Sequence, residues 1–233
     1  IKPDVVVNAA VKKGTPNIDW CEDHKPETLA VNTQGAINIL LATQAKGIYM
    51  VHLGSGCIFD NVGYDKPVTE TDPASPPSFY SWTKYWADEV LKKFPVLILR
   101  LRLPINSRPD PGNLITKLSH YNKIIDVENS ATVLDDFLYA MDQLVAKRKT
   151  GIYNVVNPGT VKYRDLMPLY QQIVDPNYKY QLIAPEELFK QGLAKAGRSN
   201  CVLSTAKLEA EGIKLRPIDQ ALKETLKEYA KNL

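Results

Sequence analysis

The sequence predicts an α/β fold, in which helices cover both faces of a parallel sheet and a smaller α+β portion follows. Three observations support this class: short apolar runs alternate with segments of helical period, the runs are apolar on both faces, and the pattern changes to shorter, mixed elements after Pro104. Apolar strands separated by helices are typical of a parallel sheet that is buried on both faces.

The first part of the chain alternates strands with helices. Each expected strand is a continuous apolar run, and the first long helix repeats apolar residues such as Leu29, Ile37 and Leu40 at helical intervals. Gly47 ends that helix, and a proline-rich loop precedes the second one. In chain order, we expect a strand at 4–10, a helix at 26–44, a strand at 48–53, a helix at 79–93 and a strand at 96–100.

Shorter elements follow in the second part of the chain. Thr132-Val133-Leu134-Asp135 matches a capping box, in which side chains satisfy the free amide groups at a helix start. Ile218, Leu222 and Leu226 share one face of an amphipathic C-terminal helix. In chain order, we expect a helix at 113–121, a strand at 124–127, a helix from 132 to about 147, a strand at 151–156 and a helix at 217–233.

Composition and charge exclude several classes of function. The 233 residues are 44% hydrophobic and carry a net charge of +3 without a long basic run, which argues against a nucleic-acid partner. No apolar stretch approaches the roughly 20 residues that span a bilayer. Cys21, Cys57 and Cys201 lack the even count of a disulfide framework and the paired spacing of a zinc site. We therefore expect a soluble, cytoplasmic protein with free thiols, no metal site and no membrane partner.

The most informative segment is Tyr80-Ser81-Trp82-Thr83-Lys84, on an expected helix. Tyr80 and Lys84 share a helical face, so the ammonium would lie near the phenol and lower its pKa from about 10. Ser55 follows the second expected strand, at the carboxyl edge of the sheet, where open α/β sheets bind ligands. Together, the three side chains would supply a hydroxyl donor, a proton donor and an activating cation.

Further motifs give the chain a specific family resemblance. With Asn8-Ala9-Ala10 and Asn32, the serine, tyrosine and lysine resemble the extended type of the short-chain dehydrogenase/reductase superfamily. Essentially the whole chain is also similar to the plant-type UDP-4-keto-6-deoxyglucose 3,5-epimerase/4-reductases, which are relatives of bacterial dTDP-4-dehydrorhamnose reductase. Segments that carry this similarity are Asn17-Ile18-Asp19-Trp20-Cys21-Glu22, Gly56-Cys57-Ile58-Phe59, Ile115-Thr116-Lys117, Thr132-Val133-Leu134-Asp135, Asn157-Pro158-Gly159 and Arg198-Ser199-Asn200.

The resemblance implies a Rossmann-like, doubly wound sheet and a reductase reaction. Residues 1–105 would form the remainder of an NADP-binding domain, and 106–233 would mainly bind the nucleotide sugar, with about 124–158 returning to the sheet. NADPH would reduce C4 of the keto sugar to give UDP-L-rhamnose, while Tyr80 delivers a proton and Ser55 holds the oxygen. The residues expected at the cofactor are Asn8, Ala9, Ala10, Asn32, Tyr80 and Lys84.

The implied epimerisation needs a base on one face of the sugar ring and an acid on the other, because a ketone at C4 acidifies the protons at C3 and C5. By the resemblance, Cys57 is one of these groups and Lys117 its partner, although His120, one helical turn later, could replace Lys117. Both inversions must precede reduction, which removes the ketone. The residues expected at the substrate are Asn106, Asn200 and, at the pyrophosphate, Arg198.

Two other functions stay open: a dTDP-4-dehydrorhamnose reductase without epimerase activity, and a non-catalytic regulatory subunit with a reductase-like fold. The intact Ser55, Tyr80 and Lys84 argue against the subunit. In its favour, the sequence has no Gly-x-x-Gly-x-x-Gly loop, with which the family binds the cofactor pyrophosphate. Since Ile1-Lys2-Pro3-Asp4 aligns with the fourth strand of the family fold, we expect the first βαβ unit to be absent and the 233-residue chain alone to bind NADPH weakly. We also expect that the chain can form a homodimer.

Overall fold

The structure is a computed structural model that describes residues 2–60 and 66–233. Its main sheet has four parallel strands in the order β1-β2-β3-β8. These strands are β1 (Val5–Asn8), β2 (Tyr49–Ser55), β3 (Leu97–Leu101) and β8 (Gly151–Asn154). All four were expected from their apolar runs, and the predicted α/β class with a parallel sheet is confirmed.

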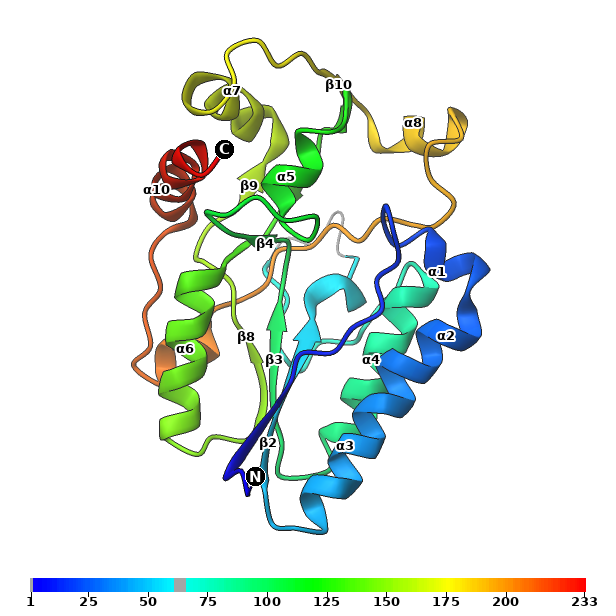
Figure 1. Ribbon diagram of the computed structural model, residues 1–233, viewed down its shortest axis with the longest axis vertical. Helices are drawn as coiled ribbons and strands as arrows, with labels where there is room; N and C mark the ends of the chain where they lie inside the picture. The colour runs from blue at the N-terminus through cyan, green and yellow to red at the C-terminus, as the bar shows by residue number, and fades with distance from the viewer. Residues whose placement is uncertain (1, 61–65) are drawn as a thin grey trace.

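Helices cover both faces of this sheet (Figure 1). On one face, α3 (Gly35–Gln44) and α4 (Phe79–Leu91) pack against Ile98 of β3. On the other face, α6 (Leu134–Ala146) packs against Leu99, the next residue of the same strand. Because successive side chains of a strand point to opposite faces, both must be apolar here, which explains the continuous apolar runs.

The helix predicted at 26–44 is a continuous helical run with a wider turn inside it. It comprises α2 (Lys25–Leu29), a π-helical stretch η1 (Ala30–Gln34) and α3. Gly47 follows with φ +62°, a left-handed conformation that glycine adopts without a steric penalty and that ends the run. Because π-helical turns are frequent at functional sites, Asn32, which lies within η1, stays a candidate site residue.

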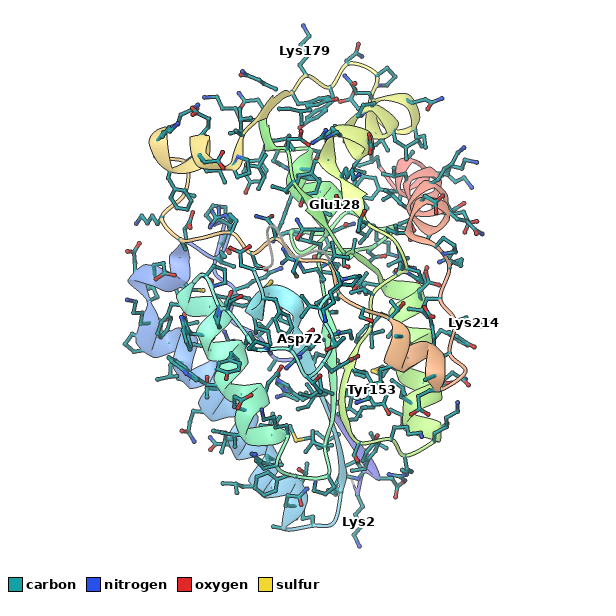
Figure 2. The ribbon with its side chains drawn as sticks, turned by 180° about the vertical axis from the view of Figure 1, so that it is seen from behind. Lys2, Asp72, Glu128, Tyr153, Lys179 and Lys214 are labelled. Carbon is teal, nitrogen blue, oxygen red and sulfur yellow. The ribbon has the colours of Figure 1, made fainter. Side chains whose placement is uncertain are left out.

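A second hydrophobic core lies beyond the carboxyl ends of the main strands. It is built from α5 (Leu114–Leu118), β5 (Lys123–Ile125), α7 (Tyr163–Ile173) and α10 (Ile218–Lys231), and β5 pairs with β10 (Gln181–Ile183). Figure 2 shows that the molecule is elongated, with Lys2 below the sheet and Lys179 at the opposite tip. The remaining short elements are α1 (Trp20–Asp23), η2 (Gly56–Ile58), β4 (Pro104–Ile105), β6 (Glu128–Asn129), β7 (Thr132–Val133), β9 (Val161–Lys162), α8 (Pro185–Lys190) and α9 (Ala206–Ala210).

The capping box predicted at 132–135 is wrong. Thr132 lies in β7, its hydroxyl donates to the carbonyl of Val155 at 2.9 Å, and it accepts from the amide of Arg102 at 3.0 Å. Helix α6 therefore starts without a side-chain cap, after Val133. Since Thr132 is fully buried between strands, those bonds hold its hydroxyl away from the helix start. None of the helices in the described part of the chain is long and apolar enough to cross a membrane.

Candidate active site

A cavity of about 380 Å³ opens at the carboxyl edge of the main sheet, between the strand ends and the second core. We call it the edge cavity. Ligands bind at this edge in open α/β folds, because the loops that follow the strands diverge there. The residues predicted from the sequence that line the edge cavity are Ala9, Ser55, Cys57, Tyr80, Lys84, Lys117, Arg198 and Asn200.

Ser55 and Cys57 reach the cavity from a single tight turn at the end of β2. Ser55 is the last residue of the strand, and the one-turn 3-10 helix η2 follows it at once. The Ser55 hydroxyl accepts a hydrogen bond from the amide of Cys57 at 3.2 Å and thereby caps that turn. The cap fixes a hydroxyl and a thiol on the same edge of the sheet.

Tyr80 lies in the first turn of α4, which Ser78 caps by accepting from the amide of Ser81 at 3.2 Å. Burial raises the pKa of the Tyr80 phenol and the charge of Cys57 raises it further, whereas a hydrogen bond with Ser55 acts in the opposite direction. The expectation that Lys84 lowers this pKa is therefore wrong for the chain as it stands. A phenol with a raised pKa stays protonated at neutral pH, but it is a weaker acid than an ordinary tyrosine.

Lys84 is turned toward β2, which explains its weak effect on Tyr80. Its ammonium donates to the carbonyl of Leu53 at 2.8 Å and lies 3.3 Å from Nε2 of His52. The other ring nitrogen of His52 lies 3.0 Å from the side-chain amide of Asn8. Burial and the nearby Lys84 hold the pKa of His52 well below 6.5, and burial also lowers the pKa of Lys84. The imidazole is therefore neutral and lies between Lys84 and the end of β1.

Asn8 and Asn32 shape the loop that follows β1. The side-chain oxygen of Asn8, Oδ1, accepts a hydrogen bond from the backbone amide of Ala10 at 3.2 Å. Asn32, within η1, accepts from the amide of Lys12 at 2.7 Å and donates to that residue's carbonyl at 3.0 Å and to the hydroxyl of Thr83 at 3.1 Å. Both asparagines are buried. Their hydrogen bonds to Ala10 and Lys12 hold the loop in place, and Ala9 of the same loop lines the edge cavity.

Lys117 and Cys57 share the edge cavity, although they come from elements about 60 residues apart in the sequence. Burial lowers the pKa of Lys117 and the neighbouring Lys13 lowers it further. His120, the alternative partner for Cys57, is exposed, and its Nδ1 lies 2.6 Å from the carbonyl of Thr116. The geometry favours Lys117 over His120.

Arg102 is a site residue that the sequence reasoning missed. It follows β3, lines the edge cavity and is only 4% exposed. Its Nη1 donates to the sulfur of Cys57 at 3.0 Å, and its Nη2 donates to Oδ1 of Asn129 at 2.7 Å and to the carbonyl of Ser199. In the sequence, Arg102 could have been recognised as a candidate site residue because it is a charged residue directly after an apolar strand and two residues before Pro104.

The expected substrate residues occupy different surroundings. Arg198 forms a two-pronged ion pair with the carboxylate of Asp19, with both N to O distances at 2.7 Å, so a phosphate group would compete with Asp19 for the same nitrogens. Asn200 accepts from the side-chain amide of Asn129 at 3.1 Å. Asn106 is held through its backbone by Asn113 and is not among the described residues that line the edge cavity.

A second cavity of about 310 Å³ adjoins the first and shares five lining residues with it. The shared residues are Asn17, Lys117, Ile125, Tyr163 and Arg198, and the additional lining comes largely from apolar side chains of α5, β5 and the segment around α8. Two adjoining cavities can together take a ligand longer than either would hold alone.

The comparisons with known proteins agree with these features. The family model described as RmlD substrate binding domain matches residues 1–231. The chain is 36% identical to an Arabidopsis thaliana bifunctional dTDP-4-dehydrorhamnose 3,5-epimerase/dTDP-4-dehydrorhamnose reductase, over 95% of this chain and 76% of that protein.

Two further relatives extend the comparison. The chain is 37% identical to the Arabidopsis thaliana trifunctional UDP-glucose 4,6-dehydratase/UDP-4-keto-6-deoxy-D-glucose 3,5-epimerase/UDP-4-keto-L-rhamnose-reductase RHM2, over 95% of this chain but only 34% of that protein. Among solved structures, the L780 UDP-rhamnose synthase of Acanthamoeba polyphaga mimivirus superposes with a TM-score of 0.89 at 30% identity, over 97% of this chain and 83% of that one.

Proposed function

The chain belongs to the RmlD substrate binding domain family, and from that premise we propose that it acts in the 3,5-epimerisation and 4-reduction of UDP-4-keto-6-deoxy-D-glucose to UDP-L-rhamnose. The observation that carries the proposal is that Ser55, Cys57, Tyr80, Lys84 and Lys117 line one cavity. A reductase needs Ser55, Tyr80 and Lys84. An acid and a base such as Lys117 and Cys57 are needed only for the inversion of ring carbons.

For the reduction, the residues fit the nicotinamide end of NADPH, since Ala9, Tyr80 and Lys84 meet in the edge cavity. NADPH supplies the hydride that C4 receives. Tyr80, which is protonated at neutral pH, gives its proton to the C4 oxygen, and the Ser55 hydroxyl holds that oxygen in place. Lys84 would hold the cofactor through its ammonium, and Asn8, Ala10 and Asn32 shape the loop whose Ala9 lines the same cavity.

For the epimerisation, Cys57 and Lys117 act on the carbons that flank the ketone. The C4 carbonyl acidifies the protons on C3 and C5, so that one group can remove such a proton while the other returns a proton to the opposite face of the ring. A lowered pKa makes the Lys117 ammonium a better proton donor than an ordinary lysine. Epimerisation precedes reduction, because the reduced sugar has no carbonyl to acidify its ring protons.

The same proposal covers the organisation of the chain and its partners. Residues 1–105 serve the cofactor and 106–233 mainly serve the nucleotide sugar, with about 124–158 returning to the sheet. Arg198 and Asn200 contact the substrate from the edge cavity, and Asn106 is the third substrate residue of the proposal. The protein is cytoplasmic and binds neither nucleic acid nor membrane.

The experiment that tests the reaction uses the natural full-length chain with UDP-4-keto-6-deoxyglucose and NADPH in D₂O. We expect UDP-L-rhamnose that carries deuterium at C3 and C5. Cys57→Ala should reduce deuterium incorporation by about 100-fold to 10,000-fold, the usual contribution of an acid-base group. Lys117→Ala should act similarly, while the matched variant His120→Ala should retain wild-type incorporation.

Each alternative function gives a different result in this experiment. Reduced product without inverted carbons would mean a reductase without epimerase activity. No consumption of either reactant, together with a stable protein partner in a pull-down, would mean a regulatory subunit. Incorporation that Cys57→Ala leaves unchanged would overturn the role of Cys57 while leaving the overall reaction intact.

A homodimer is part of the proposal, and one surface supports it. Trp82, Trp86, Val90 and Phe94 follow one another at four-residue intervals along and just beyond α4, and each is at least 36% exposed. A stripe of this kind is typical of a helix that packs against another helix. Light scattering after gel filtration should give a dimer mass for the wild type and a monomer mass for Trp86→Glu.

A further inference from the structure

Arg102 is a buried cation, and in the described part of the chain none of its side-chain hydrogen-bond partners is a carboxylate. Its contacts are the Cys57 sulfur, the side-chain oxygen of Asn129 and the carbonyl of Ser199. An arginine keeps its proton in a protein, so the charge stays even though the side chain is only 4% exposed. A buried charge is costly unless an anion or several hydrogen bonds compensate it. The surroundings of Arg102 therefore call for an anion.

Four weakly acidic groups act on Arg102 from the described part of the chain, namely Cys57, Cys201, Tyr163 and Tyr80, and burial raises the pKa of Tyr80. Cys201 is 1% exposed, its thiol donates to the carbonyl of Gly56 at 3.2 Å, and burial raises its pKa. Burial raises the pKa of Tyr163 to about 12. Tyr80, Tyr163 and Cys201 are thus neutral at physiological pH. Cys57 is different, since it borders the edge cavity and receives the Nη1 hydrogen bond directly.

We propose that Arg102 is the counter-ion that holds Cys57 as a thiolate and thereby makes it the base of the epimerisation. This inference rests on the proposed function and adds a positioning residue to it. The thiolate takes a proton from C3 or C5, and the electron pair of that C–H bond moves toward the C4 oxygen to give an enolate. Lys117 then gives a proton to the opposite face of the same carbon. The thiol loses its proton to water and the Lys117 amine regains one, which resets the pair.

The direction of the Arg102 side chain is fixed by three segments. The backbone amide of Arg102 donates to the hydroxyl of Thr132 at 3.0 Å, which anchors the residue beside β7. The side-chain oxygen of Asn129 accepts the hydrogen bond from Nη2 of Arg102 and a second one from the backbone amide of Cys201 at 2.9 Å. Asn129 is itself only 1% exposed. Leu103, the next residue, has φ +42°, an uncommon conformation that turns the chain away from β3. Nη1 is thus held toward Cys57 before any substrate binds.

Other charged or titratable groups also face Cys57, and they set the background for a pH experiment. They are Tyr80 and Lys84 from α4, Lys117 from α5, Tyr163 from α7, and Cys201. The lysines add positive potential at longer range, whereas Arg102 makes a direct contact at 3.0 Å. Removing Arg102 should therefore change the reactivity of Cys57 more than removing another cation from the same cavity.

The test measures alkylation of Cys57 by iodoacetamide against pH in the natural full-length chain, without substrate or cofactor. Peptide mass spectrometry separates Cys57 from the buried Cys21 and Cys201. Because only the thiolate reacts, the pH of half-maximal rate reports its formation. We expect this midpoint in the wild type to lie at least about one pH unit below that of Cys57 in the chain unfolded by guanidinium.

Variants assign that effect to Arg102. Arg102→Met should raise the alkylation midpoint by about one pH unit, which makes the reaction roughly tenfold slower near neutral pH. In Arg102→Lys, which keeps a positive charge, the midpoint should lie between those of the wild type and Arg102→Met. Lys13→Met removes a cation that lines the same cavity but acts on Lys117, and it should leave the midpoint unchanged.

Two results would overturn the inference. One is a midpoint in Arg102→Met equal to that of the wild type. The other is a wild-type midpoint at or above that of the unfolded chain, and this result needs no folded variant. Failure of the proposed function is distinguishable, because a low, Arg102-dependent midpoint in a protein that incorporates no deuterium into the sugar would refute the epimerisation alone.

Discussion

Acid should destabilise this protein through one buried histidine. His52 is 1% exposed in β2, with its ring nitrogens next to the side-chain amide of Asn8 and the ammonium of Lys84. A proton on the imidazole would place a second buried cation 3.3 Å from that ammonium. Burial and Lys84 accordingly hold the pKa of His52 well below 6.5. In the unfolded chain the same side chain takes up a proton near pH 6.5.

The size and sign of the effect follow from this difference. A group whose pKa is lowered by folding contributes stability that is present above its unfolded pKa and is lost as the pH falls through 6.5 toward the folded value. The loss is RT ln(1 + 10^(6.5 − pH)) as long as the folded imidazole stays neutral. This is about 0.1 kcal/mol at pH 7.5 and about 1.4 kcal/mol at pH 5.5. Between these values, His52 should therefore lower the free energy of unfolding by about 1.4 kcal/mol.

Urea unfolding of the wild type and His52→Gln at pH 7.5, 6.5 and 5.5 measures this term. Carboxylates also titrate at the acid end, so the relevant quantity is the difference between the two proteins. The stability advantage of the wild type over His52→Gln should shrink by about 1.4 kcal/mol across the range. His24→Gln and His120→Gln alter the other two histidines and serve as matched controls. An equal pH dependence of the wild type and His52→Gln would refute the reasoning.

Two substitutions away from the reacting groups test the packing. Asp88 and Arg100 form a buried ion pair with an N to O distance of 2.9 Å and side-chain exposures of 0% and 4%, so Asp88→Ala should cost about 3–5 kcal/mol in urea unfolding. The double replacement Asp88→Leu/Arg100→Met should restore most of that loss, and a cost below about 1 kcal/mol for the single variant would contradict the pairing. A Cβ at Gly197 would lie 2.7 Å from the carbonyl oxygen of Pro77, so Gly197→Ala should lower the free energy of unfolding by about 1–3 kcal/mol. At Gly35, which lies in a helix, the nearest contact of a Cβ would be 3.4 Å. Gly35→Ala should therefore leave the free energy of unfolding unchanged or raise it by up to about 1 kcal/mol. Equal stabilities for these two alanine variants would show that the contact with Pro77 is not restrictive.

The main sheet could be predicted from the sequence because its strands are apolar on both faces. Met50 and Val51 of β2 point to opposite sides and are each fully buried, which leaves no polar alternation to confuse the pattern. Helix α7 could not be predicted in the same way. Pro168 lies inside it, and a proline normally ends a helix because it lacks the amide hydrogen. The packing of Leu166 and Met167 in the second core outweighs that local penalty.

The site could be predicted only as far as local spacing reaches. Tyr80 and Lys84 share a helix, so their common face followed from the interval of four residues. The direction of the Lys84 ammonium did not follow, because a buried cation turns to the nearest acceptors, and these belong to β2. The contact of Arg102 with Cys57 joins residues 45 positions apart and depends on Asn129 as well. The spacing of residues along the sequence therefore does not predict the contact between Arg102 and Cys57.

The proposed roles of Cys57 and Tyr80 are coupled through charge while the ring carbons are being inverted. While Cys57 is a thiolate, its negative charge adds to burial in raising the pKa of Tyr80, so the phenol keeps its proton. When Cys57 takes a ring proton, that charge disappears and Arg102 loses its counter-ion. Both changes make Tyr80 a stronger acid just as negative charge develops on the C4 oxygen beside it. Proton delivery by Tyr80 is therefore favoured after proton removal by Cys57. The coupling thus lets Tyr80 stabilise the enolate stage of each inversion, and it ends when Cys57 returns its proton to water.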